Sequence, residues 1–164
     1  FFRGEVDKYT WVDIGSSYLP GEITAAFLYA QLSNADRITS SRLEVWNFYH
    51  DSFAESCKSL NIIQPSMPPH IQHNGHIFYL ILPDHCSRNL FISELKKANI
   101  QAVFHYIPLH DSPAGNKFSK TSGELPITSD LSSRLVRLPL YIGVDSEKVV
   151  AAAANILSNP VFSL

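Results

Sequence analysis

Apolar residues recur three or four positions apart through most of the chain, with charged and polar residues between them. Pro20 and Asp145 suit helix starts, since proline fits the first helical turn and aspartate accepts from free backbone amides. The pattern predicts a series of helices, over residues 20–32, 35–57, 87–98 and 128–136 and from Asp145 to the Asn-Pro pair at 159–160.

Strands are predicted where short apolar runs replace the helical spacing. Residues 76–82 read His-Ile-Phe-Tyr-Leu-Ile-Leu, which is typical of a strand buried on both faces. A second strand is expected after the helix at 87–98 and ends before Pro108. A third is expected at 137–141, and its internal proline indicates a sheet edge, because proline cannot donate a ladder hydrogen bond.

The order of these elements predicts an α+β fold, with long N-terminal helices followed by a small mixed, partly antiparallel sheet that has helices on one face. The pattern thus indicates a long helical section followed by a small α/β unit. Residues 111–127 are rich in Pro, Gly and Ser, which favours a long surface loop with one helical turn near 113–118. The chain begins Phe-Phe-Arg-Gly without Met, as though cut from a longer polypeptide.

Composition narrows the classes of function. Hydrophobic residues make up 45% of the chain and charged residues 17%, which is ordinary for a globular protein. The net charge is −2 and Lys and Arg form no cluster, so no nucleic-acid partner is expected. No apolar run is long enough to span a membrane, and there is no signal peptide. Cys57 and Cys86 are expected to be free thiols in a reducing cytoplasm.

Candidate chemistry concentrates in residues 99–110. His105, Tyr106 and His110 lie at the expected strand end and in the loop beyond it. Pro108 removes a backbone donor and forces the preceding residue into an extended conformation, so these polar groups are offered where strand pairing stops. Loops on rigid supports are where binding residues concentrate. A buried strand whose aromatic and histidine side chains simply pack is the alternative.

Metal and anion sites are less favoured. Three histidines spaced three apart, with a histidine and a cysteine following, have the ligand types of a zinc site: His70, His73, His76, His85 and Cys86. Prolines and a glycine in that stretch disfavour the helix that would gather the histidines, so no metal site is expected.

Two short patterns could hold an anion, each with an ordinary structural alternative. The Gly-Ser-Ser at 15–17 precedes the helix near Pro20, and helix N-termini bind anions readily. An ordinary turn whose serines cap the chain is the favoured alternative. Arg134 and Arg137 could clamp a carboxylate, but their spacing of three also suits a solvated face.

Three motifs occur in order along the chain: Tyr9 to Leu32, Ala102 to His110 followed by Ser-Pro-Ala-Gly, and Arg137 to Tyr141. Together they resemble the DegT/DnrJ/EryC1/StrS sugar aminotransferases across essentially the whole chain. The resemblance implies a fold-type-I pyridoxal phosphate (PLP) enzyme, normally a homodimer. The PLP lysine would precede this chain, in a large domain. Residues 1–57 would connect from that large domain, and residues 58–164 would form a small C-terminal α/β domain. The chain alone would therefore hold no catalytic residue, bind no PLP and be inactive.

The same resemblance implies a set of binding residues. The strand end that lines the nucleotide-sugar site in relatives matches Val103, Phe104, His105 and Tyr106. His110 would support them. Ser17 stands where many relatives have an asparagine that reaches the PLP phosphate of the partner subunit. The implied reaction moves an amino group from glutamate to C4 of a dTDP-4-keto-6-deoxyhexose. A non-catalytic nucleotide-sugar-binding or interaction module with the same fold is the alternative.

Overall fold

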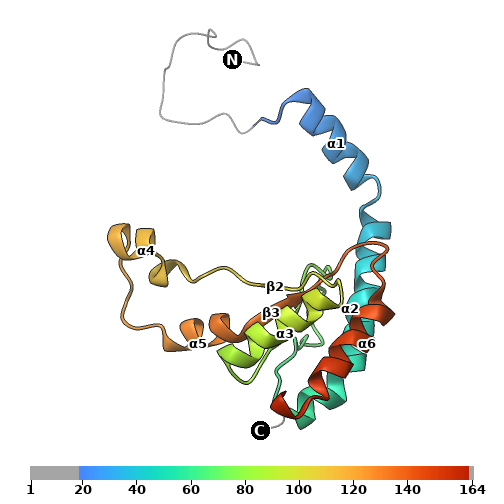
Figure 1. Cartoon of the computed structure of the whole chain (residues 1–164). Helices are drawn as coiled ribbons and strands as arrows, with labels where there is room; N and C mark the ends of the chain where they lie inside the picture. The colour runs from blue at the N-terminus through green and yellow to red at the C-terminus, as the bar shows by residue number, and fades with distance from the viewer. Residues whose placement is uncertain (1–18, 163–164) are drawn as a thin grey trace. The chain divides into compact units, whose positions relative to one another are not determined.

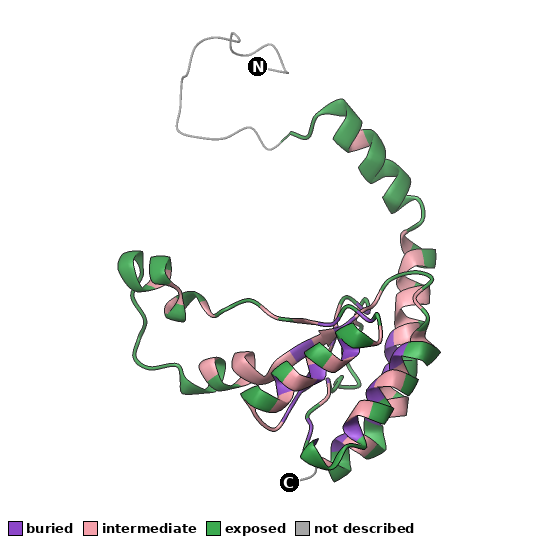
Figure 2. Cartoon of the chain, in the orientation of Figure 1, coloured by how far each residue is buried: buried purple, intermediate pink, exposed green. Residues whose placement is uncertain are grey.

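The computed structural model describes residues 19–162 (Figure 1). The chain divides into two compact units between Ala35 and Asp36. Helix α1 (Glu22–Leu32) belongs to the first unit and begins two residues after the predicted Pro20. It contains no buried residue, and Figure 2 shows it almost entirely exposed. Its apolar side chains, including Ile23 and Phe27, thus find no partner within the described part of their own unit.

The second unit carries the sheet and the remaining elements. They are α2 (Ala35–Ser59), β1 (Phe78–Ile81), α3 (His85–Lys97), β2 (Val103–Phe104), the 3-10 turn η1 (Leu109–Asp111), α4 (Pro113–Phe118), α5 (Pro126–Arg134), β3 (Leu135–Leu138), α6 (Ser146–Leu157) and the 3-10 turn η2 (Pro160–Phe162). Helix α3 packs against α5, α6 and β3. The α+β prediction is confirmed, as is the helical turn at 113–118, which is α4.

The three described strands lie in the order β1-β3-β2, and both pairings are antiparallel. Phe78 lies opposite Leu138 and Phe104 opposite Val136, which fixes the register. The sequence predicted a mixed sheet, whereas every described strand pair is antiparallel. The connection from β1 through α3 to β2 brings β2 to the far side of β3, so the two strands flank β3 without pairing with each other.

The third predicted strand is misplaced in two respects. It was expected at the sheet edge over 137–141, but β3 spans Leu135–Leu138 and is the central strand. The strand ends before Pro139, so the proline limits its length and does not place it at the edge. Helix α5 correspondingly ends at Arg134, two residues before the predicted end of its helix.

Buried side chains from β1 and β3 project to the same face and join the helices in one core. Phe78, Leu80, Val136 and Leu138 are each no more than a few per cent exposed, whereas Tyr79 and Arg137 on the other face are half-buried. Helix α2 contributes its apolar stripe to this core, through Trp46, Tyr49, Phe53 and Cys57. The predicted placement of helices on one face of the sheet is thus confirmed.

Two polar groups on α2 are satisfied by backbone carbonyls near the sheet. Trp46 donates to the Ile77 carbonyl at 3.1 Å, and the Tyr49 hydroxyl donates to the Pro139 carbonyl at 2.9 Å. Burial raises the pKa of Tyr49 far above its usual range, so its hydroxyl keeps the proton that it donates. Since an unpaired buried N–H or O–H is costly, these bonds fix where α2 lies along the sheet. Helix α2 therefore shares the core of the second unit, while the domain boundary expected after residue 57 stays a prediction about the complete protein.

Aspartates cap the N-termini of α6 and α3. Asp145 accepts from the Lys148 amide at 3.0 Å, as predicted. Asp84 accepts from the Ser87 amide at 2.9 Å, so α3 starts at His85, two residues before the predicted start. Hydrogen bonds from the Ser87 hydroxyl and from the Ser87 backbone amide lower the pKa of the Asp84 carboxyl. None of the described helices is both long and apolar enough to cross a membrane.

Replacing Phe78 with Ala is expected to lower the free energy of unfolding by about 3–5 kcal/mol, because the lost ring leaves a cavity among Trp46, Tyr49 and Phe53. Urea unfolding followed by tryptophan fluorescence measures the change. Phe118, which is 78% exposed, provides the matched Ala control, with an expected change within about 0.5 kcal/mol. Equal losses in the two variants would contradict the assigned core.

The two cysteines are expected to differ sharply in alkylation. Both are free, but Cys57 is buried and Cys86 is exposed. Burial raises the pKa of the Cys57 thiol to about 11, so the reactive thiolate is scarce at neutral pH and increases only as the pH approaches that value. Mass spectrometry after iodoacetamide treatment at neutral pH should find Cys86 modified in the folded protein and Cys57 only in denaturant. Comparable native rates would show that Cys57 is not buried.

Candidate functional site

The candidate site begins where β2 ends. Only Val103 and Phe104 pair with β3, opposite Arg137 and Val136. Residues 105–108 continue beyond the pairing, and η1 follows from Leu109. The second strand is therefore much shorter than the sequence indicated. Its polar side chains nevertheless lie where pairing stops.

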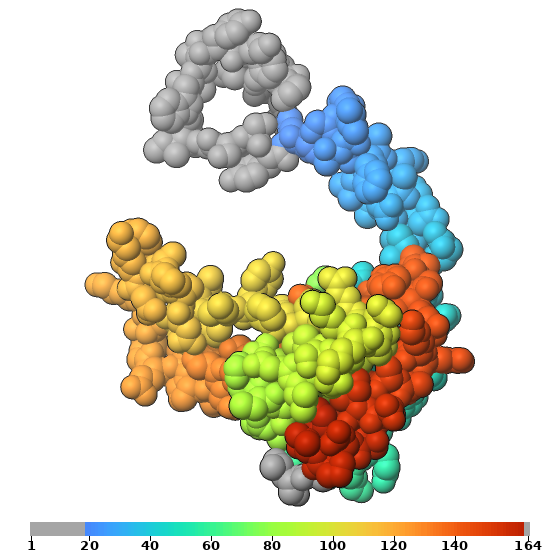
Figure 3. Space-filling model, in the orientation of Figure 1, coloured from blue at the N-terminus to red at the C-terminus, as the bar shows by residue number. Residues whose placement is uncertain are grey.

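A pocket of about 410 Å³ lies between α3, the segment after β2 and α5. In Figure 3 the surfaces of these three elements, green, yellow and orange, adjoin on the visible face. Phe104, His105 and Tyr106 line this pocket, together with Arg88 of α3. Val103 lines an adjoining smaller pocket that also includes Phe104, His105 and Tyr106. The structure thus brings four of the predicted binding residues together.

His105 and Tyr106 present different hydrogen-bonding groups to this region. Their rings meet edge to face with centroids 5.5 Å apart. Tyr106 is 81% exposed, whereas the Nδ1 atom of His105 is buried and has no hydrogen-bond partner in the described part of the chain. A buried polar atom without a partner is unusual in a folded protein and calls for a ligand, water or another chain.

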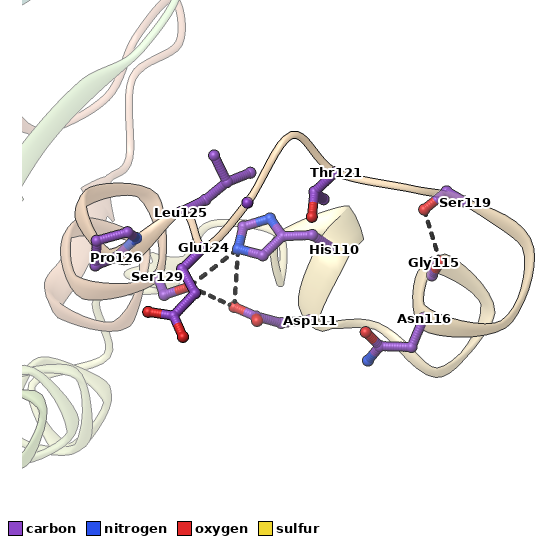
Figure 4. Close-up of a pocket in the computed structure, with 11 residues that line it drawn as sticks. His110, Asp111, Gly115, Asn116, Ser119, Thr121, Glu124, Leu125, Pro126 and Ser129 are labelled. Atoms are coloured by element: carbon purple, nitrogen blue, oxygen red, sulfur yellow. Dashed lines mark hydrogen bonds and ion pairs between the residues drawn. The ribbon is translucent and has the colours of Figure 1, made fainter.

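His110 lies apart from that pocket and takes part in a small polar cluster (Figure 4). Its Nε2 is 3.0 Å from the hydroxyl oxygen of Ser129 on α5, and the Ser129 hydroxyl donates to Asp111 at 2.8 Å. The same Nε2 lies 3.5 Å from the Asp111 carboxylate. The cluster joins η1 to the start of α5 and borders a second pocket of about 590 Å³.

The cluster of His110, Asp111 and Ser129 does not have the arrangement of a hydrolase triad. In such a triad the histidine lies between serine and aspartate and uses a different ring nitrogen for each. Here one nitrogen faces both partners, and the serine gives its single proton to the carboxylate. The cluster therefore links η1 to α5, and we call the hydrogen bonds of Ser129 to Asp111 and His110 the Ser129 latch. Sequence reasoning missed Ser129 and Asp111, because their contact joins positions eighteen residues apart.

Arg88 is the functional candidate that sequence reasoning missed altogether. It is 7% exposed, and its guanidinium carbon lies 5.5 Å from the centre of the Phe104 ring. Burial lowers the pKa of Arg88, and its Nε has no hydrogen-bond partner within residues 19–162. The sequence did contain a signal for its burial, because Arg88 lies at helical spacing from Phe91 and Leu95, which are buried residues of α3.

The guanidinium of Arg134 already forms hydrogen bonds within the fold. Two of its nitrogens donate to the two carboxylate oxygens of Asp130, at 3.0 and 2.6 Å, and a third donates to the Leu82 carbonyl at 2.8 Å. The hydrogen bonds from Arg134 lower the pKa of Asp130. Arg134 therefore tethers α5 to the end of β1. Arg137 lies on the half-buried face of the sheet, opposite Val103. The two arginines are thus not joined in one carboxylate clamp.

Two of the histidines considered as metal ligands make other contacts. His73 packs edge-on against Trp46, with ring centroids 4.5 Å apart, and the His76 carbonyl accepts from Arg42 at 2.8 Å. Within residues 19–162, no three His, Cys, Asp or Glu side chains are placed to hold a metal ion. Ser17, proposed to reach a cofactor phosphate, lies outside the described residues.

Pyridoxal phosphate is covalently held by a lysine whose amine is usually shielded from water. Every lysine in the described part of the chain is exposed, including Lys96 and Lys97 at the end of α3. The described residues therefore do not fit a covalent PLP site.

The chain belongs to the DegT/DnrJ/EryC1/StrS aminotransferase family, whose sequence profile matches residues 2–156. Among curated proteins, it is 30% identical over 146 residues to the uncharacterized protein MJ1066 of Methanocaldococcus jannaschii, covering 87% of this chain and 37% of that protein.

Solved structures agree on the fold. S. venezuelae DesV, in complex with a ketimine intermediate, superposes with a TM-score of 0.81 at 23% identity, over 95% of this chain and 42% of that one. A DegT/DnrJ/EryC1/StrS aminotransferase from Brucella abortus gives 0.80 at 22% identity, over 96% and 41%. Helicobacter pylori PseC gives 0.72 at 20% identity, over 93% and 41%. The chain thus spans less than half the length of each relative named here.

The Ser129 latch leads to a direct test. Replacing Ser129 with Ala should raise hydrogen exchange of the backbone amides in residues 109–118 roughly tenfold, because a hydrogen bond to a charged carboxylate contributes about 1.5–3 kcal/mol. Exchange measured by mass spectrometry reports the change. Ser158 provides a matched Ala control, since its hydroxyl bonds only the Asn155 carbonyl of its own helix. Unchanged exchange in 109–118 would show that the cluster does not hold η1.

Proposed function

We propose that this chain is the C-terminal portion of a PLP-dependent nucleotide-sugar aminotransferase. The complete protein would move an amino group from glutamate to C4 of a dTDP-4-keto-6-deoxyhexose. Membership of the aminotransferase family supports the reaction class. The motifs of this chain are similar to those of the dTDP-4-amino-4,6-dideoxygalactose transaminase of enterobacterial common antigen synthesis, which suggests the sugar. The related PseC is an aminotransferase of pseudoaminic acid biosynthesis.

The observation that carries the proposal is the unpaired segment after β2 beside a pocket. His105 and Tyr106 would hydrogen-bond the nucleotide sugar, and their position beyond the last ladder bond leaves their side chains available. Val103 and Phe104 would form an apolar wall beside them. His110 would support the segment through Ser129 on α5.

The remaining parts of the proposal concern the complete protein. Its cofactor would be PLP, bound by a lysine outside this chain, and this chain alone would be inactive. Ser17 would donate to the PLP phosphate of a partner subunit in a homodimer. The protein would work in the cytoplasm, where nucleotide sugars are made.

The cofactor test uses the full-length protein loaded with PLP. Adding glutamate should decrease the absorbance band of the lysine-bound form of the cofactor and increase that of the amine form, because the amino group passes to the cofactor and glutamate leaves as 2-oxoglutarate. Residues 1–164 alone, treated in the same way, should show no change. A full-length spectrum that does not respond to glutamate would overturn the aminotransferase assignment.

Variants of the full-length protein allow the sugar step to be tested separately from the glutamate step. His105→Ala and Tyr106→Phe should raise the KM for the keto-sugar roughly tenfold, the loss of about 1.4 kcal/mol of binding, and leave the glutamate step unchanged. If residues 1–164 alone bind a dTDP-sugar as tightly as the full-length protein does, the non-catalytic binding module would be the better assignment.

A further inference from the structure

The pocket between α3, β2 and α5 contains a buried cation without a described counter-charge. Arg88 is only 7% exposed, yet it forms none of the ion pairs found within residues 19–162. Its Nε has no hydrogen-bond partner there. Burying an unpaired charge is costly, because water no longer solvates it. The unpaired charge of Arg88 nevertheless lies at the wall of a pocket.

The contact with Phe104 offsets part of that cost and also orients the guanidinium. The Arg88 guanidinium carbon lies 5.5 Å from the ring centre, within the range of a cation–π contact. Phe104 itself is fixed by its pairing with Val136. The planar donor group is therefore held between a helix and a strand end, and both residues line the pocket.

The groups around Arg88 favour an anion. The buried Nδ1 of His105 also lacks a partner, and His85, Asn89, Ser132 and Ser133 line the same pocket. Asp111 is the acidic residue among the lining residues, and its carboxylate already accepts from Ser129 and faces His110. The pocket thus combines an unpaired cation with polar groups and leaves no free carboxylate to neutralise it.

We propose that Arg88 binds the diphosphate of the nucleotide sugar, using its guanidinium fork beside His105 and Tyr106. This inference rests on the proposed function and names the residue that recognises the charged part of the substrate. A guanidinium presents parallel donors that match phosphate oxygens in pairs, which a neutral side chain cannot do. A phosphate would also supply the negative partner that Arg88 lacks within the described residues.

The test measures binding of thymidine diphosphate and of thymidine to the full-length protein by calorimetry. Arg88→Gln should weaken thymidine diphosphate roughly tenfold or more, since each factor of ten corresponds to about 1.4 kcal/mol. Thymidine, which has no phosphate, should bind as before. Lys96→Gln removes one positive charge from the exposed side of the same helix and should change neither affinity.

The Arg88→Lys variant and the glutamate step distinguish diphosphate binding from other roles of Arg88. Arg88→Lys keeps the charge but not the planar fork, so it should show an intermediate loss for thymidine diphosphate even if Arg88→Gln fails to fold. Wild-type affinity in Arg88→Lys, or equal losses for thymidine and its diphosphate, would overturn the proposal. So would a defect confined to the glutamate step, because it would assign Arg88 to the carboxylate of the amino donor. Diphosphate binding is measured without turnover, so a protein that lacks aminotransferase activity can still pass or fail this test.

Discussion

The packing of α2 on the sheet through Phe78 is the contact on which the second unit depends. The Phe78 ring is fully buried and meets Trp46, Tyr49 and Phe53, with ring centroids 5.3 to 6.2 Å apart. Aromatic pairs at such spacing add to the stability that burial alone provides. The Tyr49 hydroxyl then bonds the Pro139 carbonyl just beyond β3. One helix is thereby joined to the edge strand and to the end of the central strand.

That arrangement determines where the candidate site lies. β3 is held between β1 and β2, and its Val136 sets the position of Phe104 at the end of a two-residue strand. β2 is too short to pair further, so the chain leaves the sheet at His105. Helix α3 packs against β3 and brings Arg88 over Phe104. A rigid core thus supports a polar segment that makes no ladder hydrogen bonds.

The sequence predicted the order and type of the elements better than their pairing. Helical spacing located α2 and α6, and the Asp145 cap follows from local chemistry alone. Pro139 was misread, because a proline just after a central strand has the same sequence signature as one within an edge strand. The Ser129 contact with Asp111 depends on the path of the loop between them, and no local pattern records that path. Arg88 was detectable from its helical spacing, but a charged residue on an inward stripe reads at first as an exception to the pattern.

The candidate site combines residues that the core fixes in place with residues whose positions depend on them. Apolar contacts fix Phe104, Phe104 orients Arg88, and the pairing of β2 leaves His105 and Tyr106 free. The latch at Ser129 holds the next turn, so the segment from His105 to His110 is supported at both ends. None of these side chains has the environment of a PLP lysine or a nucleophile. These side chains carry polar groups that are exposed or that have no partner within the described residues, and a rigid core holds them in place. Such groups suit the recognition of a charged ligand.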